Sequence, residues 1–259
     1  MSHDSNKQEL EKFVAQCKDI LDSDLEKTGL VIYSDRNTLR PNPVLFYGIN
    51  PGQDPKNHHH THWSIEKSLN EFASGHPSLI THQAWPKRKV VGGTYVNDYE
   101  PGQAPYQRRT QHLLNEIGHS NALVTNLLFL QSRGVQELGK MQTLADSEKL
   151  LASCWQVHEL ILEICRPEVI ITCTTAVDRC MGEKFELREE SHFPAMHVLN
   201  DGKGKDRQCT VFTGNWKERA LTVVAIPHMS YYAITSPHRK AVVEKLKSVV
   251  KTATNGRPI

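Results

Sequence analysis

The sequence has little net charge and no long apolar run. Its 259 residues include 31 Lys and Arg against 29 Asp and Glu, a formal net charge of +2 at pH 7. This near-balance excludes a uniformly basic protein that coats nucleic acid, so any such contact must come from a local basic patch. Nowhere do about 18 uninterrupted apolar residues occur, and this argues against a membrane-spanning helix.

The sequence also lacks paired cysteines. No two of its six cysteines form a C-x-x-C pair, and several lie in apolar stretches, where a free thiol behaves as a small hydrophobe. The opening segment, MSHDSNKQELEKF, contains no apolar run, so no secretory signal is visible. We therefore expect free thiols and a cytoplasmic location.

Short apolar runs alternate with segments of helical spacing. With 38% hydrophobic residues the chain can bury a core. Four continuous apolar runs, typical of buried parallel strands, begin at Pro43, Ala122, Pro167 and Leu221. Strands alternating with helices predict a three-layer α/β/α fold with a mainly parallel four-stranded central sheet. The helices are expected over residues 8–25, 108–117, 146–165, 176–181 and 237–251.

We expect residues 1–259 to form one domain that begins with a helix. Residues 53–105 are poor in periodicity and rich in His, Gly, Pro and Asn, which predicts a long irregular insertion. The stretch 189–219 is also polar and irregular, with a hairpin around 208–213.

Polar side chains mark the ends of three predicted strands. Asn50 follows the first strand, Asn126 lies in the second, and His228 follows the fourth. Right-handed crossovers place the carboxyl ends of parallel strands on one edge, where ligands bind. Taken alone, a strand-end Gly/Pro turn can be only a turn, and a single histidine can be structural.

The motifs around these residues resemble those of a known enzyme family. Gly48-Ile49-Asn50-Pro51-Gly52 resembles the first motif of the uracil-DNA glycosylase superfamily, in the form used by its mismatch-specific and single-strand-selective branches. The segment 228–230, His-Met-Ser, resembles the second motif, and the segment 123–126 resembles the strand that offers an asparagine to the flipped base.

The resemblance implies a monofunctional DNA glycosylase that removes uracil or a related base from DNA. Asn50 would place the attacking water, His228 would stabilise the leaving base, and Asn126 would bind the edge of that base. Other base contacts would come from Gly48, Ile49, Gly52 and the aromatic Tyr106, with Trp85 and Tyr95 as alternatives; contacts to DNA would come from Arg108, Arg109, Ser230, Tyr231 and Tyr232.

Departures from the family pattern keep alternatives open. Gly52 stands where the most uracil-restricted branch has a tyrosine, which favours relaxed specificity, and Met229 replaces a proline. A non-catalytic nucleic-acid or nucleotide-binding module on the same fold is the main alternative, whereas the absence of a G-x-S-x-G elbow disfavours an α/β-hydrolase.

We expect no cofactor and a monomer whose partner is DNA. The cysteines lack the arrangement of iron–sulfur branches. The histidines at 58, 59, 60 and 62 lack paired cysteine or acidic ligands, so we expect no specific metal site.

Overall fold

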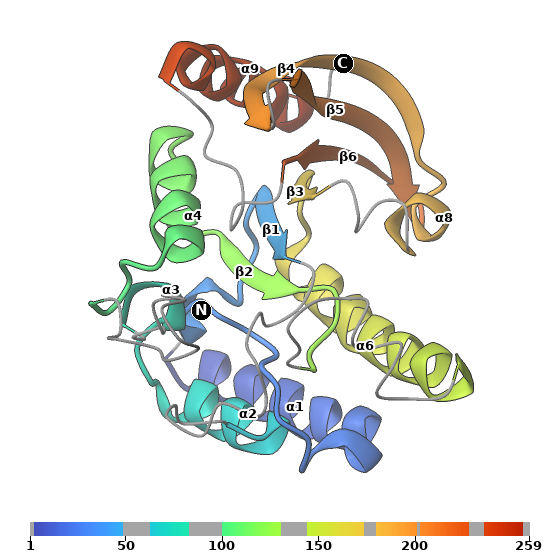
Figure 1. Cartoon of the computed structure of the whole chain (residues 1–259). Coiled ribbons are helices and arrows are strands. Elements are labelled where there is room, and N and C mark those ends of the chain that lie inside the picture. Colours follow the sequence, from blue (N-terminus) through green and yellow to red (C-terminus); the bar gives the residue numbers. More distant parts are fainter. Residues whose placement is uncertain are drawn as a thin grey trace.

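Six strands form a single sheet in the order β2-β1-β3-β6-β5-β4 (Figure 1). The fold comes from a computed structural model, which describes residues 3–48, 63–82, 100–130, 144–173, 180–200, 203–227 and 236–255. The chain is mixed α/β with a mostly parallel, curled sheet, as the alternation of apolar runs and helical spacing predicts.

The four strands expected from apolar runs are all present. They are β1 (Val44–Gly48), β2 (Leu123–Asn126), β3 (Val169–Cys173) and β6 (Arg219–Ile226). The strand β1 pairs in parallel with β2 and β3, and β3 pairs in parallel with β6. Their carboxyl ends therefore lie on one edge of the sheet, as predicted.

Two long strands replace the irregular stretch predicted over 189–219. The strands β4 (Arg188–Asn200) and β5 (Lys203–Trp216) form an antiparallel hairpin, and β5 pairs antiparallel with β6. The sheet therefore has six strands where the sequence predicted four. Register shifts in β4 between Glu189 and Ser191 and between Pro194 and Met196 break the two-residue period, which hides the strand in the sequence.

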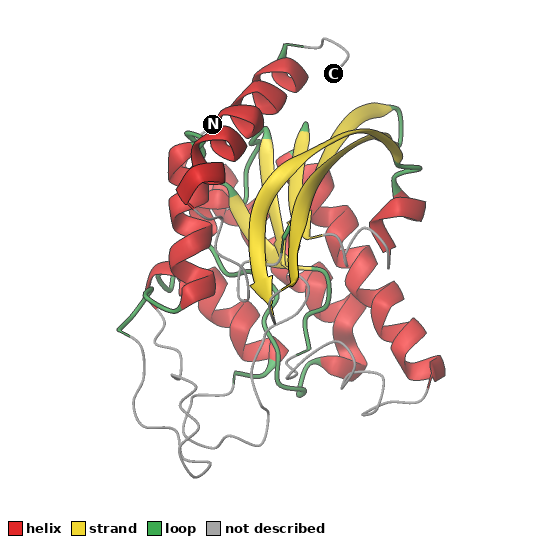
Figure 2. Ribbon diagram, turned by 45° about the horizontal axis from the view of Figure 1, so that its top comes forward, coloured by secondary structure: helices red, strands yellow, loops and turns green. Residues whose placement is uncertain are grey.

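Helices cover both faces of the sheet (Figure 2). One buried cluster joins Leu45 and Ile170 of the strands to the helices α1, α2 and α6. The other joins Phe46 and Ile171 to α3, α4 and α9. Burial of alternate residues on opposite faces explains why these strands appear as continuous apolar runs. The helices are α1 (His3–Leu21), α2 (Ile65–Ser74), α3 (Leu79–His82), α4 (Pro105–Glu116), α6 (Leu144–Cys165), α8 (Gly182–Lys184) and α9 (Ser236–Thr254).

Part of the segment 53–105 is helical, contrary to the prediction of an irregular insertion. The helix α2 buries Ile65, Leu69 and Phe72 at helical spacing. Ser64 caps its first turn by accepting a hydrogen bond from the Lys67 N–H, and Gly75 ends it in the left-handed conformation at φ 90°. An amphipathic helix of only ten residues between polar flanks gives too weak a period to stand out. The predicted helix at 176–181 lies largely outside the described residues.

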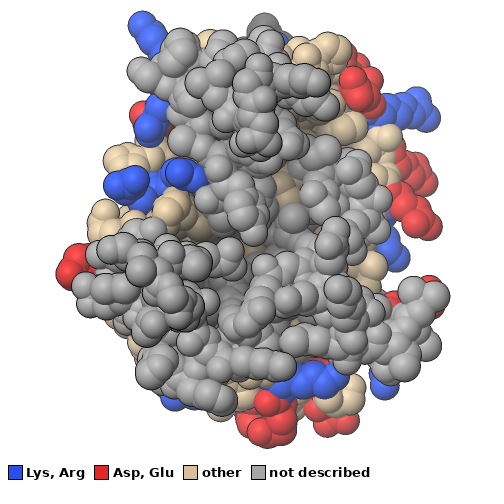
Figure 3. Space-filling model, viewed as in Figure 1, with Lys and Arg blue, Asp and Glu red and all other residues tan. Residues whose placement is uncertain are grey.

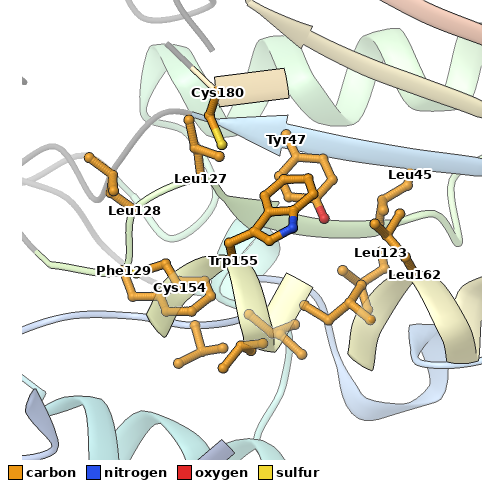
Figure 4. Close-up of a cluster of buried hydrophobic side chains, with 14 of the residues drawn as sticks. Leu45, Tyr47, Leu123, Leu127, Leu128, Phe129, Cys154, Trp155, Leu162 and Cys180 are labelled. Carbon is orange, nitrogen blue, oxygen red and sulfur yellow. The ribbon is translucent and has the colours of Figure 1, made fainter. Parts of the chain in front are cut away.

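An aromatic cluster fills the core beneath β1 and β2. Trp155 of α6 contacts Phe185 and Trp216, with ring centroids 5.4 and 6.1 Å apart. Figure 4 shows Trp155 beside Tyr47 of β1 and Phe129, which follows β2. Such edge-to-face contacts between large side chains stabilise the packing of α6 on the sheet. Within the described ranges, no helix combines the length and apolar character needed to cross a lipid bilayer.

We predict that the six thiols of the folded protein resist Ellman's reagent at pH 8. All six cysteines are free and buried, and burial raises the pKa of Cys154 and Cys209 to about 12 and that of Cys180 to about 11. Both the access of the reagent and the thiolate fraction are therefore low. Absorbance should report six thiols only after unfolding. The exposed variant Ser248→Cys should react at once, and fast labelling of any native cysteine would contradict the prediction.

Candidate functional site

The candidate site lies where β1 and β2 end side by side. Gly48 pairs with Asn126 as the last residue of each strand. Beyond this pair, the Leu127 N–H donates to the Gly48 carbonyl at 3.0 Å. The Asn126 side chain is thereby held at the carboxyl edge of the sheet, with only 2% of the residue exposed.

Gly48 lets two polar side chains approach the backbone of β1. A Cβ atom at this position would overlap the Asn126 Oδ1 atom and lie 2.7 Å from the Tyr106 hydroxyl. Both contacts are closer than real Cβ atoms allow, so only glycine fits. The structure thus brings together three residues that the sequence assigned to base binding: Gly48, Tyr106 and Asn126.

The first turn of α4 positions Tyr106. The Gln107 side-chain carbonyl accepts from the Ala104 N–H at 3.1 Å, and its amide donates to the Leu79 carbonyl at 2.7 Å. The Gln111 amide donates to the Ile80 carbonyl at 2.8 Å. These bonds fix α4 to α3. Tyr106 therefore comes from a rigid helix, half-buried against the core with its hydroxyl inside the site.

Tyr33 is a further residue of the site, which the sequence analysis missed. The segment 30–34 runs along the outer edge of β2, where the Tyr33 N–H donates to the Val124 carbonyl at 2.8 Å. The Val124 N–H donates to Ser34 Oγ at 3.0 Å. These bonds place the buried Tyr33 ring next to the Asn126 side chain. The apolar run GLVIY ahead of the first strand is the signal that could have indicated it.

The described part of the site is polar and uncharged. Burial raises the pKa of Tyr33 well above its usual range, as does its neighbour Tyr106, whereas a hydrogen-bonding interaction with the Asn126 side chain opposes this rise. Burial likewise raises the pKa of Tyr106. Both phenols are therefore neutral hydroxyls at physiological pH.

Asn126 presents a hydrogen-bond donor to this neutral site. Its buried Nδ2 atom makes no hydrogen bond of regular geometry to a described residue, although the Tyr33 hydroxyl lies close to this side chain. Buried amide groups are normally paired, and a buried donor left unpaired costs about 1–3 kcal/mol. The arrangement therefore suits an uncharged planar ligand with a carbonyl acceptor.

Most of the other predicted site residues lie outside the described residues. These are Ile49, Asn50, Gly52, His228, Ser230, Tyr231 and Tyr232. The described chain reaches Gly48, the first residue of the first motif, and Pro227, directly before the second. Gly48 ends β1 and Pro227 directly follows β6, at the carboxyl ends of two strands that each pair with β3.

The two predicted DNA-binding arginines lie on α4, near Tyr106. Arg108 is exposed, and Arg109 is half-buried and has contacts of its own. Figure 3 shows several Lys and Arg side chains at its left margin, on the side where Figure 1 places α4, and a mixture of both charges at the right. Among the described residues, no group of three His, Cys, Asp or Glu side chains could hold a metal ion; the histidines 58–60 and 62 lie outside them.

A buried histidine supports the site from below. His158 of α6 donates from Nε2 to the Leu127 carbonyl at 2.9 Å. Its ring packs edge-on against Tyr47 and Phe129, with centroids 5.0 and 4.9 Å away. Burial lowers the pKa of His158 to about 4, against the opposing effect of the bond to Leu127, so the ring is neutral. In the sequence, His158 lies on the apolar side of a predicted helix. A single histidine in that position is usually structural, so the sequence alone did not assign it to the site.

Neither protein-family models nor curated proteins match this chain. Its functional assignment therefore depends on the residues of the site and on the sequence motifs.

We predict that Gly48→Ala lowers the free energy of unfolding by about 1–3 kcal/mol, because the new methyl group displaces Asn126 or Tyr106. Urea denaturation measures the loss. Gly214→Ala is the matched control, since its Cβ would meet the Phe185 carbonyl away from the site. Both variants should lose stability, but only Gly48→Ala should shift the side-chain amide signal of Asn126 in an NMR spectrum. An unchanged signal would contradict the proposed crowding.

We predict that His158 makes the protein sensitive to acid. Its pKa falls from 6.5 to about 4 on folding, so the unfolded chain binds its proton first. Stability is then lost as the pH falls from about 6.5 to about 4, by about 3 kcal/mol in full. Urea titrations over this range should show that His158→Gln removes this component. The exposed His112→Gln should leave it in place; an equal effect of both variants would refute the assignment.

Proposed function

We propose that this protein is a monofunctional DNA glycosylase, which hydrolyses the N-glycosidic bond of uracil or a related damaged or mismatched base. The observation that supports this most directly is the buried Asn126 amide beside Gly48, whose Nδ2 makes no hydrogen bond of regular geometry to a described residue. The carbonyl oxygen of a flipped base would supply that acceptor. The Asn126 amide, which lacks a regular hydrogen bond among the described residues, would then gain one when substrate binds.

The two proposed catalytic residues come shortly after the carboxyl ends of β1 and β6 in the chain. Asn50 comes two residues after Gly48, and His228 comes two residues after the end of β6. Asn50 would position water at the sugar carbon, since an amide cannot deprotonate it. The bond would break largely by dissociation, and His228 would donate a hydrogen bond to the departing base anion. No lysine adduct is part of this mechanism.

The neutral character of the described site supports a base as ligand rather than a phosphate. Tyr33 and Tyr106 remain protonated because burial raises the pKa of each hydroxyl. Tyr106 would lie against the base, and Gly52 would leave room for substituents larger than the hydrogen of uracil. Extrusion of the nucleotide costs a few kcal/mol, and Tyr231 or Tyr232 would fill the gap.

DNA is the proposed partner of a monomer that needs no cofactor. Exposed Arg108 lies two residues from Tyr106 on α4, where it would contact a phosphate near the flipped nucleotide. Arg109 and Ser230 would add further contacts. With helices on both faces of the sheet, we propose that the fold is a three-layer α/β/α arrangement of the uracil-DNA glycosylase superfamily.

A non-catalytic nucleotide-binding module is the second candidate. It is favoured by the composition of the described site, in which Tyr33, Tyr106 and Asn126 are all neutral and can bind a base without acting as acid or base. Binding of uracil-containing DNA without release of the base would distinguish this candidate.

We predict that the full chain releases uracil from DNA oligomers that carry one uracil. Single strands and duplexes with uracil, a thymine mismatch or hypoxanthine are incubated with protein, and alkali then cleaves the abasic product. Asn50→Ala and His228→Ala should each lower the rate about 100-fold or more, because each removes a transition-state contact. Asn126→Ala should also lower the rate of base release, by about tenfold or more, because the polar edge of the base loses its hydrogen bond to Asn126.

Matched variants on α4 control for the loss of an amide and an imidazole. Asn115→Ala and His112→Ala change exposed residues and should leave the rate unchanged. If no base in the panel is released, or if release survives both Asn50→Ala and His228→Ala, the glycosylase proposal fails.

A further inference from the structure

The backbone that carries Asn126 is tied down on both sides as it leaves β2. On one side, the Leu127 N–H donates to the Gly48 carbonyl at 3.0 Å. On the other, the Leu127 carbonyl accepts from His158 Nε2 at 2.9 Å. Leu127 is therefore the point at which α6 and β1 jointly fix the direction of the adjacent Asn126 residue.

Burying the imidazole of His158 in this part of the core costs desolvation free energy. The residue is fully buried, and its Nδ1 atom has no partner among the described residues. Aromatic rings enclose it, among them Tyr47, Phe129 and Trp155, the side chains that Figure 4 shows around Leu127. A leucine would fill similar space without burying an unpaired polar atom. The contact that a leucine cannot make is the hydrogen bond to the Leu127 carbonyl.

We propose that His158 is a positioning residue for the candidate site, which holds Leu127 so that the Asn126 amide meets its ligand in one orientation. This inference rests on the proposed function, because it assigns Asn126 the task of binding the base. His158 touches neither the base nor the sugar and acts through one peptide unit.

The proposal predicts a split between catalysis and DNA binding. Small displacements of a group that positions substrate can cost about 100-fold in rate. The proposed phosphate contacts, at Arg108, Arg109 and Ser230, do not involve His158, so the affinity for the DNA backbone should not change. His158→Leu should therefore lower kcat about tenfold to 100-fold on a uracil oligomer with little change in KM. His158→Gln, whose amide can donate to the same carbonyl, should stay within about threefold of the wild type.

A second measurement, hydrogen exchange, detects the hydrogen bond between His158 and the Leu127 carbonyl without an activity assay. Loss of one hydrogen bond worth about 1.4 kcal/mol corresponds to about tenfold in a local opening equilibrium. In His158→Leu, the Leu127 amide should exchange its hydrogen about tenfold faster, while amides in the middle of β3 change less. His158→Gln should restore protection of the Leu127 amide.

Ile161→Ala is the matched control for simple loss of core packing. Ile161 lies three residues after His158 on α6, is fully buried and belongs to the same cluster. It should lower stability without lowering kcat once the folded fraction is taken into account. The positioning role is overturned if Ile161→Ala lowers kcat as much as His158→Leu, if His158→Gln gives no rescue, or if Leu127 exchange is unchanged in His158→Leu.

These outcomes separate the two proposals. Wild-type protein that releases no base overturns the proposed function, and the positioning role of His158 in that function falls with it. Wild-type activity combined with normal kcat in His158→Leu overturns the positioning role alone.

Discussion

The close approach of β1 and β2 at Gly48 and Asn126 is the constraint on which the site depends. Parallel pairing brings these residues level at the strand ends, and the missing side chain of Gly48 leaves room for the Asn126 amide and the Tyr106 hydroxyl. A strand end of any other residue type would push both groups away. The site is thus a consequence of one backbone contact, which the buried strands and the first turn of α4 hold from opposite sides.

Polar groups are concentrated beneath this contact at a cost to stability. Among the described residues, Asn126 Nδ2, His158 Nδ1 and the Tyr47 hydroxyl are buried without hydrogen-bond partners. Buried polar atoms are normally paired, so a group of exceptions near one strand end needs an explanation. The proposed ligand of Asn126 and the proposed positioning role of His158 would account for two of them. Stability given up at such a place is typical of sites shaped for binding rather than for packing.

Strong periodic signals in the sequence predicted most of the sheet but not its outer parts. The runs that form β1 and β3 are continuous and apolar because both faces of these strands are buried. The hairpin β4–β5 escaped detection because bulges interrupt its alternation, and α2 because a helix of only ten residues gives a weak period. Tyr33 escaped because its segment joins the sheet only through the outer edge of β2, a contact that no local pattern reveals.

The sequence by itself determined the alternation of strands and helices, the glycine–asparagine motif after the first strand, and the candidates Asn126 and Tyr106. These follow from local rules, in which period, chain breakers and residue chemistry act over a few positions. Only the tertiary structure decided that Gly48, Tyr106 and Asn126 meet, that Tyr33 joins them, and that His158 supports the strand end beneath them. Contacts between residues so far apart in the chain depend on how whole elements pack, and packing is a property of the folded molecule rather than of any segment.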